Sequence, residues 1–510
     1  MKHRTLASGI GIAAVAALAL TSCSAGPDAG TEAAELDTLS IMAPYLVTNA
    51  PEDGNQFETA IEDEIGVDLD ITWVPNSSYG DKVNITLAGD DLPQVMVIQG
   101  KDPGFVRNAE AGAFWDLTDY LDDYDNLKTT FPQVQHSSSI NGKVYGIFRS
   151  RDVMREAVII RKDWLANLGL DLPTTTDELR EVATAFTEND PDGNGVDDTY
   201  GLIIPKWPGT IGTNSPWDAI ETWYGAGNRW TERDGELVPN FTTDEWLEAV
   251  QFERELVEDG VVNPDYATFD SAKWNEPFLT GKGGIIIDVH SRAGQLMTLL
   301  KEQDPEGFQN YVDVTGNLEG PDGELNALPT AGYSGFLAIP KAQVKTEEQL
   351  RAVLEVLNKM NSDTVGPLLN NGIEGVTYEL DGDLAVAIDD VPQADKDTSA
   401  SYAQLGTNVT GFQGYLPKQA SEYEQEMYDK RKEIEASDLE SAVYDPSAAY
   451  VSETYVSKGA QLDTIVADAR IQYIAGQLDL DGLQDAVDLW RSSGGDDVIA
   501  EINELADADS

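Results

Sequence analysis

Cysteine, histidine and basic residues are all scarce in this chain of 510 residues, which has one cysteine, three histidines and 33 basic residues against 91 acidic ones. A lone cysteine leaves no disulfide within the chain. So few histidines offer little material for a metal-hydrolase centre or a Ser-His-Asp triad. The formal net charge of −58 repels phosphate backbones and anionic lipid headgroups. This charge argues against a nucleic-acid partner and against membrane adhesion through basic patches.

Long apolar runs are absent beyond the N-terminal region. The run 6–20 follows a basic start, as in a secretory signal peptide, and is too short for a comfortable membrane span. Leu20-Thr-Ser-Cys23 resembles the bacterial lipobox, in which the cysteine is lipidated. We therefore expect a signal peptide at 1–22, a lipidated flexible linker at 23–37 that begins at Cys23, and a location on the extracellular face of the cell membrane. The alternative is an ordinary signal peptide that contains a cysteine.

An acidic loop rich in glycine, from Asn189 to Gly201, has the spacing of a calcium-binding loop. Oxygen-bearing side chains fall at positions 1, 3 and 5, and Gly195 occupies the sharp turn at position 6. Position 12 is Gly201, where an EF-hand has a bidentate glutamate, so a further ligand must come from elsewhere. The alternative is a polar surface turn, because the same residue types form turns. We expect a structural Ca²⁺ held by Asp190, Asp192, Asn194, the Val196 carbonyl and Asp198.

The N-terminal third alternates between strand and helix patterns. Strands are predicted at 39–42, 67–73 and 93–100, and a helix near 57–65, which is typical of an α/β sheet with parallel neighbours. In such sheets ligands bind beyond the carboxyl ends of the strands. This placement makes Tyr45, Gln99 and Lys101 candidate ligand-binding residues, although each could equally be an ordinary loop residue.

Several segments together resemble a known family. The run 159–170, the segment Pro173–Glu178, the loop Asp190–Gly195 and the segment Asp198–Gly201 are similar to the lipoprotein type of extracellular solute-binding protein, which serves carbohydrate ABC importers, and to alginate-oligosaccharide binders. The resemblance implies an α/β fold of the two-lobed periplasmic-binding-protein type (type II), with a hinge of several crossing segments and a helical C-terminal extension. It implies one lobe from 38–150 plus 285–340, and a second lobe from 151–284 plus 341–510.

The resemblance also places the crossings between the lobes. Residues 143–152 resemble the first crossing, 281–288 a strand returning to the first lobe, and 332–340 the third crossing. Arginines at the first crossing could bind carboxylates of uronic sugars, or could pair with some of the many acidic side chains. The candidate ligand-binding residues at the crossings are Arg149, Arg151, Asp288, His290 and Tyr333.

Half of the ten tryptophans lie between Trp207 and Trp246. Flat aromatic faces suit sugar rings, yet aromatic residues at helical spacing are more often part of a core. Trp246 follows a helix-capping pattern and is expected to be buried. The candidates for lining the cleft are Trp207, Trp217, Trp223 and Tyr224.

These observations predict a monomeric binding protein rather than an enzyme. It would capture an oligosaccharide between its lobes and deliver the sugar to the transmembrane permease of an ABC importer. No P-loop, dinucleotide or G-x-S-x-G motif is present. A secreted carbohydrate-active enzyme, such as a glycosidase with paired carboxylates or a lyase, stays open as an alternative, as does a surface adhesin.

Overall fold

A computed structural model of the chain describes residues 36–89, 91–207 and 211–509. The expected signal peptide, Cys23 and the linker up to residue 35 lie outside the described residues. Within the described part, no helix is both long enough and apolar enough to cross a membrane.

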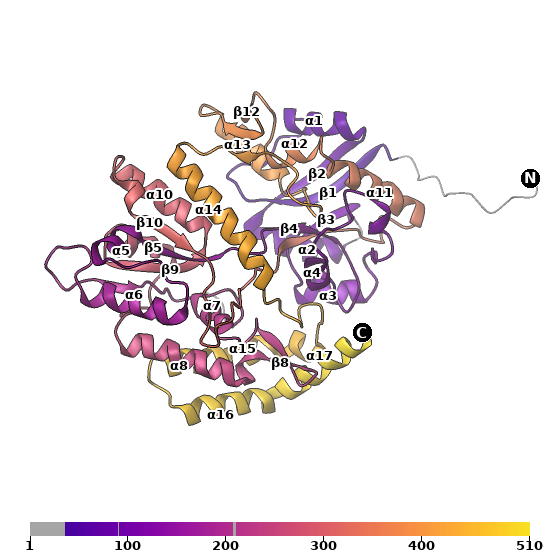
Figure 1. Cartoon of the computed structure of the whole chain (residues 1–510). Helices are drawn as coiled ribbons and strands as arrows, with labels where there is room; N and C mark the ends of the chain where they lie inside the picture. Colours follow the sequence, from indigo (N-terminus) through magenta and orange to yellow (C-terminus); the bar gives the residue numbers. More distant parts are fainter. Residues whose placement is uncertain (1–35, 90, 208–210, 510) are drawn as a thin grey trace, which may run out of the picture.

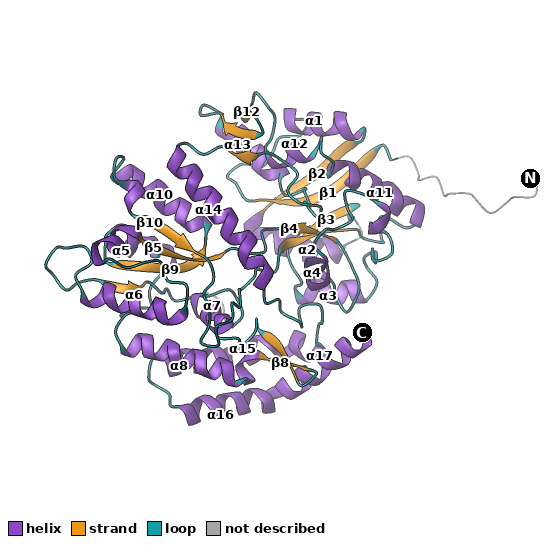
Figure 2. Ribbon diagram, viewed as in Figure 1, coloured by secondary structure: helices purple, strands orange, loops and turns teal. Residues whose placement is uncertain are grey.

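A mixed five-stranded sheet forms the centre of the first lobe, in the order β2-β1-β3-β11-β4 (Figure 2). β1 pairs in parallel with β2 and β3, and β11 runs antiparallel between β3 and β4. All four residues of β3 are buried, which explains its uninterrupted apolar sequence. The strands are β1 (Thr38–Tyr45), β2 (Asp68–Pro75), β3 (Val95–Ile98), β4 (Ile147–Ser150) and β11 (Tyr333–Ala338).

Helices from two distant parts of the chain cover this sheet. α1 begins after Asn55, whose side chain accepts hydrogen bonds from the backbone of Phe57 and Glu58, and ends at a left-handed Gly66. The helices are α1 (Gln56–Ile65), α2 (Asn76–Leu87), α3 (Pro103–Glu110), α4 (Pro132–Ser138), α11 (Glu347–Met360), α12 (Gly366–Asn370) and α13 (Gln393–Tyr402). A small sheet of β12 (Tyr378–Asp381), β13 (Leu384–Ala387) and β14 (Leu416–Pro417) is formed between 378 and 417.

The second lobe contains a four-stranded sheet in the order β10-β5-β9-β6. Its strands are β5 (Glu156–Arg161), β6 (Tyr200–Leu202), β9 (Gly283–Val289) and β10 (Val312–Thr315). β9 packs closely on α6, because a Cβ added at Gly284 would lie 2.3 Å from the Phe186 ring. The helices of this lobe are α5 (Lys162–Leu168), α6 (Thr176–Glu188), α7 (Pro216–Trp223), α9 (Asn275–Leu279), α10 (Ser291–Gln303) and α14 (Glu422–Asp438).

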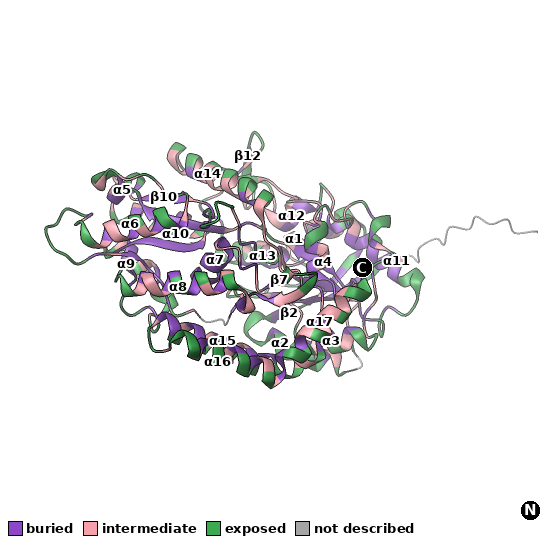
Figure 3. Cartoon of the chain, turned by 60° about the horizontal axis from the view of Figure 1, so that its bottom comes forward, coloured by how far each residue is buried: buried purple, intermediate pink, exposed green. Residues whose placement is uncertain are grey.

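The C-terminal helices extend the second lobe rather than the first. They share a hydrophobic core with α8, in which Trp246 and Val250 meet Val466, Tyr473 and Trp490. Figure 3 shows that the outer faces of α15 and α16 are exposed. The elements are β7 (Trp230–Arg233), β8 (Glu236–Pro239), α8 (Asp244–Glu258), α15 (Glu453–Ile474), α16 (Leu480–Trp490) and α17 (Asp496–Asp509).

The chain passes between the two sheets at 151–155, at 316–332 and at 418–421, and α14 lies along the boundary between the lobes (Figure 1). The expected two-lobed α/β architecture and helical C-terminal region are confirmed. The crossing at 151–155 overlaps the expected first crossing (143–152) at its end, and the crossing at 316–332 meets the expected third crossing (332–340) only at Gly332, because 333–338 forms β11 of the first sheet.

The pairing of strands differs from the expected lobe assignment in two segments. β9 and β10 belong to the second sheet, so within 285–340 only β11 joins the first sheet. α11 and α12 pack in the first core, although 341–510 was assigned to the second lobe. The physical reason is that the sequence pattern of a buried strand is the same whichever sheet the strand joins. The pattern of an amphipathic helix is likewise the same whichever sheet the helix packs on.

Candidate ligand pocket

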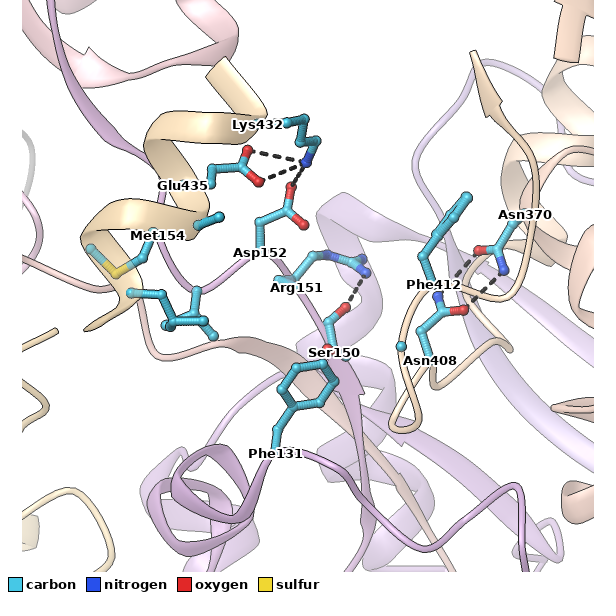
Figure 4. Close-up of a pocket in the computed structure, with 14 residues that line it drawn as sticks. Phe131, Ser150, Arg151, Asp152, Met154, Asn370, Asn408, Phe412, Lys432 and Glu435 are labelled. Carbon is cyan, nitrogen blue, oxygen red and sulfur yellow. Dashed lines mark hydrogen bonds and ion pairs between the residues drawn. The ribbon is translucent and has the colours of Figure 1, made fainter. Parts of the chain in front are cut away.

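A pocket of about 430 Å³ opens between the two lobes at the first crossing. Figure 4 shows its lining residues: α14 contributes one wall, and the loop that carries Asn408 and Phe412 contributes the opposite wall. We call it the interlobe pocket. It is lined by Phe131, Ser150, Arg151, Asp152, Val153, Met154, Asn370, Asn408, Gly411, Phe412, Lys432, Glu435, Ala436 and Leu439.

Arg151 lies in the middle of the interlobe pocket. Its Nη1 donates a hydrogen bond to the Ser150 carbonyl at 3.0 Å, and the guanidinium points towards the loop of Phe412 (Figure 4). Burial and the nearby charge of Arg155 lower the pKa of Arg151. A guanidinium in this position can donate paired hydrogen bonds to a planar acceptor such as a carboxylate.

Aromatic and amide side chains complete the wall on the side of the first lobe. Phe412 is 52% exposed, and Phe131 is half-buried just before α4. Asn370 and Asn408 exchange hydrogen bonds of 3.0 and 3.2 Å through their amide groups. Exposed ring faces beside amide donors and acceptors form a surface that can bind the apolar face and the hydroxyls of a sugar.

The opposite wall carries an ion-pair network. Lys432 Nζ lies 2.8 and 3.1 Å from the two oxygens of Glu435 and 3.5 Å from Asp152 Oδ2. His290, at the end of β9, contacts Glu435 through Nε2. Burial alone would raise the pKa of Glu435, but His290 and Lys432 hold it below its ordinary value.

The same network has a possible metal-ligating geometry. One ligand atom each from Asp152, His290 and Glu435 lie within 4.8 Å of one another. A metal ion at this position would have to compete with Lys432, whose ammonium pairs with Glu435 and lies 3.5 Å from Asp152. We therefore interpret the network as an ion-pair contact between α14 and the first crossing.

Arg149 lies behind the interlobe pocket and is only 2% exposed. Its partners are neutral, because Nη1 donates to the Ser334 carbonyl at 2.9 Å and Nη2 to Gln404 Oε1 at 2.7 Å. Its Nε has no hydrogen-bond partner among the described residues. Burial and the charge of Arg151 lower the pKa of Arg149 to about 9, so the side chain is still a cation at neutral pH.

Lys101 and Tyr333 line a second, smaller pocket of about 210 Å³. Lys101 Nζ donates to the carbonyls of Ser137 at 2.7 Å, Ser139 at 3.0 Å and Ala448. Burial lowers its pKa to about 8. Because the ammonium is saturated by three backbone carbonyls, Lys101 connects α4 to the segment before α15. Its position favours a structural role over the expected ligand contact.

Other predicted site residues lie apart from the interlobe pocket. Tyr45 ends β1, and Gln99 donates to Asn76 Oδ1 at 2.6 Å. Asp288 is buried and paired with Arg292. None of these three residues lines any of the pockets described here, and His290 reaches the interlobe pocket only through Glu435.

The aromatic cluster differs from expectation. Trp223 is fully buried and donates from Nε1 to Asn317 Oδ1 at 2.8 Å, and Trp217 is 4% exposed in the same core. Neither side chain is accessible to a ligand, because α7 turns both into the second lobe. Tyr224 packs on Phe252, and Trp207 is half-buried against Trp274.

The aromatic rings that line the interlobe pocket are instead Phe131 and Phe412, which were not among the residues predicted from the sequence. The sequence Gly411-Phe412-Gln-Gly414 was the available signal, since an aromatic residue in a glycine-rich loop has little to pack against.

The candidate calcium loop protrudes at the outer edge of the second lobe, on the left in Figure 1. The carboxylates of Asp190 and Asp192 both accept from the Asn194 backbone N–H, at 3.0 and 3.2 Å. The Gly195 N–H donates to Asp190 at 2.9 Å, and the Val196 N–H donates to Asn194 Oδ1 at 2.7 Å. Asp190 and Asp192 therefore turn towards the same backbone N–H, whereas the side-chain oxygen of Asn194 turns towards Val196. Asp198 does not join them, because Lys282 binds its carboxylate and lowers its pKa.

Two lobes on separate sheets, several crossings and a pocket between the lobes define a two-lobed solute-binding protein. The sequence profile of the bacterial extracellular solute-binding proteins matches residues 49–367. The chain belongs to this family. It is 42% identical over 491 residues to lipoprotein LipO of Bacillus subtilis (strain 168), covering 96% of each chain. It is 32% identical over 491 residues to the polygalacturonan/rhamnogalacturonan-binding protein YtcQ of the same strain, covering 94% of this chain and 92% of that one.

Solved structures share the fold at lower identity. An extracellular solute-binding protein from Bifidobacterium longum subsp. infantis superposes with a TM-score of 0.70 at 18% identity, covering 93% of this chain and 98% of that chain. An EF-hand mutant of the Streptococcus pneumoniae ABC-transporter substrate-binding protein FusA, in complex with fructo-nystose, has a TM-score of 0.55 at 20% identity, covering 92% and 96%. YtcQ is named as a polysaccharide-binding protein, and FusA as the substrate-binding protein of an ABC transporter.

Proposed function

We propose that this protein captures an oligosaccharide in the interlobe pocket and delivers it to the permease of an ABC importer. The observation that carries the proposal is the composition of the pocket, in which aromatic rings and amides on the side of the first lobe and the Arg151 guanidinium at the first crossing face α14 of the second lobe. Family members named for carbohydrates support the same ligand class. Closure of the lobes around the sugar would produce the state that the permease recognises.

The proposal includes the form in which the protein acts. Lipidation of Cys23 would tether it to the extracellular face of the cell membrane, which the name of the lipoprotein relative supports. It would act as a monomer and would bind its ligand without chemical change. Relatives that are named as binding proteins support binding over catalysis.

We further propose a structural Ca²⁺ in the loop Asp190–Gly201. Asp190, Asp192 and Asn194 would supply side-chain oxygens, and Val196 its carbonyl. The close approach of the Asp190 and Asp192 carboxylates, which share the Asn194 N–H as donor, supports this assignment. Asp198 would join only after release from Lys282. The EF-hand named for the pneumococcal protein supports the loop type. The distance of the loop from the interlobe pocket supports a role in stability rather than in ligand contact.

Titration calorimetry and small-angle scattering with a panel of oligosaccharides test the proposed function. We expect saturable binding of at least one sugar, a decrease in the radius of gyration on binding, and recovery of the sugar intact. Release of shorter fragments would establish a carbohydrate-active enzyme instead. Binding without any change in the radius of gyration would favour a surface adhesin.

A further inference from the structure

The arginines at the first crossing lack the partners that other arginines in this chain have. Arg180, Arg254 and Arg351 each lie within 3.1 Å of a carboxylate oxygen. By contrast, among the described residues no carboxylate oxygen lies within 4.0 Å of a nitrogen of Arg149 or Arg151. Several other arginines, such as Arg107 and Arg431, also lack such a partner, but among the described arginines only Arg151 lines the interlobe pocket.

Both carboxylates that line the interlobe pocket lie close to Lys432. Its Nζ is 2.8 Å from Glu435 Oε2 and 3.5 Å from Asp152 Oδ2, and Figure 4 shows Asp152 directed towards Lys432 while Arg151 points the other way. Arg151 therefore makes no direct ion pair within the pocket, although the charge of Asp152 still raises its pKa from a distance. The charge of Arg155 acts in the opposite direction, and Arg151 in turn lowers the pKa of Arg149.

A single hydrogen bond holds Arg151 in place, so most of its N–H donors are available to a ligand. Phe131 and Phe412 approach from two sides, and the amides of Asn370 and Asn408 lie beside Phe412 (Figure 4). A sugar ring stacked on an aromatic face could place a ring substituent on the guanidinium fork. The substituent that matches a planar cationic fork is a carboxylate, because two parallel charge-assisted hydrogen bonds form at once.

We propose that the interlobe pocket selects a carbohydrate that carries a carboxylate, with Arg151 as the residue that binds this group. The inference rests on the proposed function, since it requires that a carbohydrate occupies this pocket. The inference goes beyond the proposed function because it states the charge of the ligand and the residue that binds the charged group. Arg149 and Arg155 would strengthen the attraction without contacting the sugar.

Matched ligands test the proposal directly. Trisaccharides of galacturonate and of mannuronate are each compared by calorimetry with their fully methyl-esterified counterparts, which have the same rings without the charge. We expect at least one acid form to bind roughly 10- to 100-fold more tightly than its ester, in line with the strength of a charged hydrogen bond. Arg151→Gln should remove this difference, because it should lower the affinity for the acid form far more than the affinity for the ester. Arg151→Lys should restore only part of it, because lysine keeps the charge but not the fork.

Arg107→Gln is the control, since it removes an exposed arginine from α3 of the same lobe, away from the pocket. It should bind both ligand forms as the wild type does. Equal affinity of the wild type for acid and ester overturns the inference, and so does an acid preference that survives in Arg151→Gln. If a neutral oligosaccharide binds with closure of the lobes while no acid form binds, the proposed function stands and this inference falls. If no sugar of either kind binds, both fall.

Discussion

At the scale of single residues, Glu253 on α8 is fully buried with neither carboxylate oxygen hydrogen-bonded among the described residues. Asp218 and Glu221 from α7 face it, together with Arg470 from α15, which bonds those two acids at 2.7 and 2.8 Å. Burial and the charge of Glu221 raise the pKa of Glu253 well above 4.5, and burial raises that of Glu221 to about 7. The cluster therefore retains a proton that the unfolded chain would release.

This retained proton makes stability depend on pH. Because the folded state binds more protons than the unfolded state above pH 4.5, the free energy of unfolding falls as pH rises from there towards 7. Glu253→Gln imitates the protonated form, so it should stabilise the protein by roughly 1–3 kcal/mol at about pH 8 and have little effect at about pH 5. Chemical denaturation at both pH values measures this difference. Glu248→Gln, on the exposed face of α8, is the control, and equal effects of Glu253→Gln at the two pH values would contradict the prediction.

At the scale of elements, β11 contains a bulge at Gly335, where the strand packs closely against β3. Gly335 has φ of +80°, and a Cβ there would lie 2.1 Å from the Ile98 carbonyl oxygen. Gly375 has the same φ, but a Cβ there would meet nothing within 4 Å. Comparison of the two glycines separates steric clash from backbone strain.

Gly335→Ala should destabilise the protein by roughly 1–3 kcal/mol more than Gly375→Ala does, because only the first adds overpacking to the cost of a left-handed alanine. Denaturant unfolding of both variants measures the difference. Equal losses would mean that the contact between β11 and β3 can relax.

The calcium loop is a second element with a testable property. Chelation with EDTA should lower the melting temperature by several degrees and added calcium should restore it, because an ion bound only to the folded state stabilises it. Asp192→Ala should abolish the response. Asp171→Ala, which removes an exposed carboxylate elsewhere in the second lobe, should preserve it. A melting temperature insensitive to EDTA in the wild type would argue for a simple polar turn.

Elements defined by local interactions were predictable, whereas those defined by distant ones were not. The capping pattern before Trp246 is an example, because the Thr243 hydroxyl accepts from the Trp246 N–H only three positions later, so the sequence pattern contains the whole interaction. The sheet that β9 joins depends on β5 and β6, and no pattern within the sequence of β9 specifies these partners.

The candidate site was likewise predictable only where it depends on local sequence. Arg151 was found because it lies at a recognisable crossing, but the wall it faces, with Phe412, comes from residues more than 250 positions away.

At the scale of the whole molecule, the charge imbalance dominates the electrostatics. With 91 acidic residues against 33 basic ones, most carboxylates repel one another across the surface. Raising the salt concentration from about 0.01 to about 1 M shortens the screening length from about 30 to about 3 Å. With calcium in excess, we expect the melting temperature to rise by several degrees over this range. KCl in place of NaCl is the control for a specific sodium effect, and a fall in melting temperature would show that surface ion pairs outweigh the repulsion.

The position of β11 in the first sheet also determines when that lobe can be completed. β4 pairs only with β11, and β11 is inserted between β3 and β4 although it follows them by more than 180 residues. During synthesis and export, the first 150 residues must therefore wait, with one edge of their sheet open, until the segment at 333–338 has emerged. By that time the strands of the second lobe have already appeared. The sheet that begins first is therefore finished last, and a break in the chain at 151–155 or at 316–332 would separate β11 from the other strands of that sheet while leaving the four strands of the second sheet in one piece.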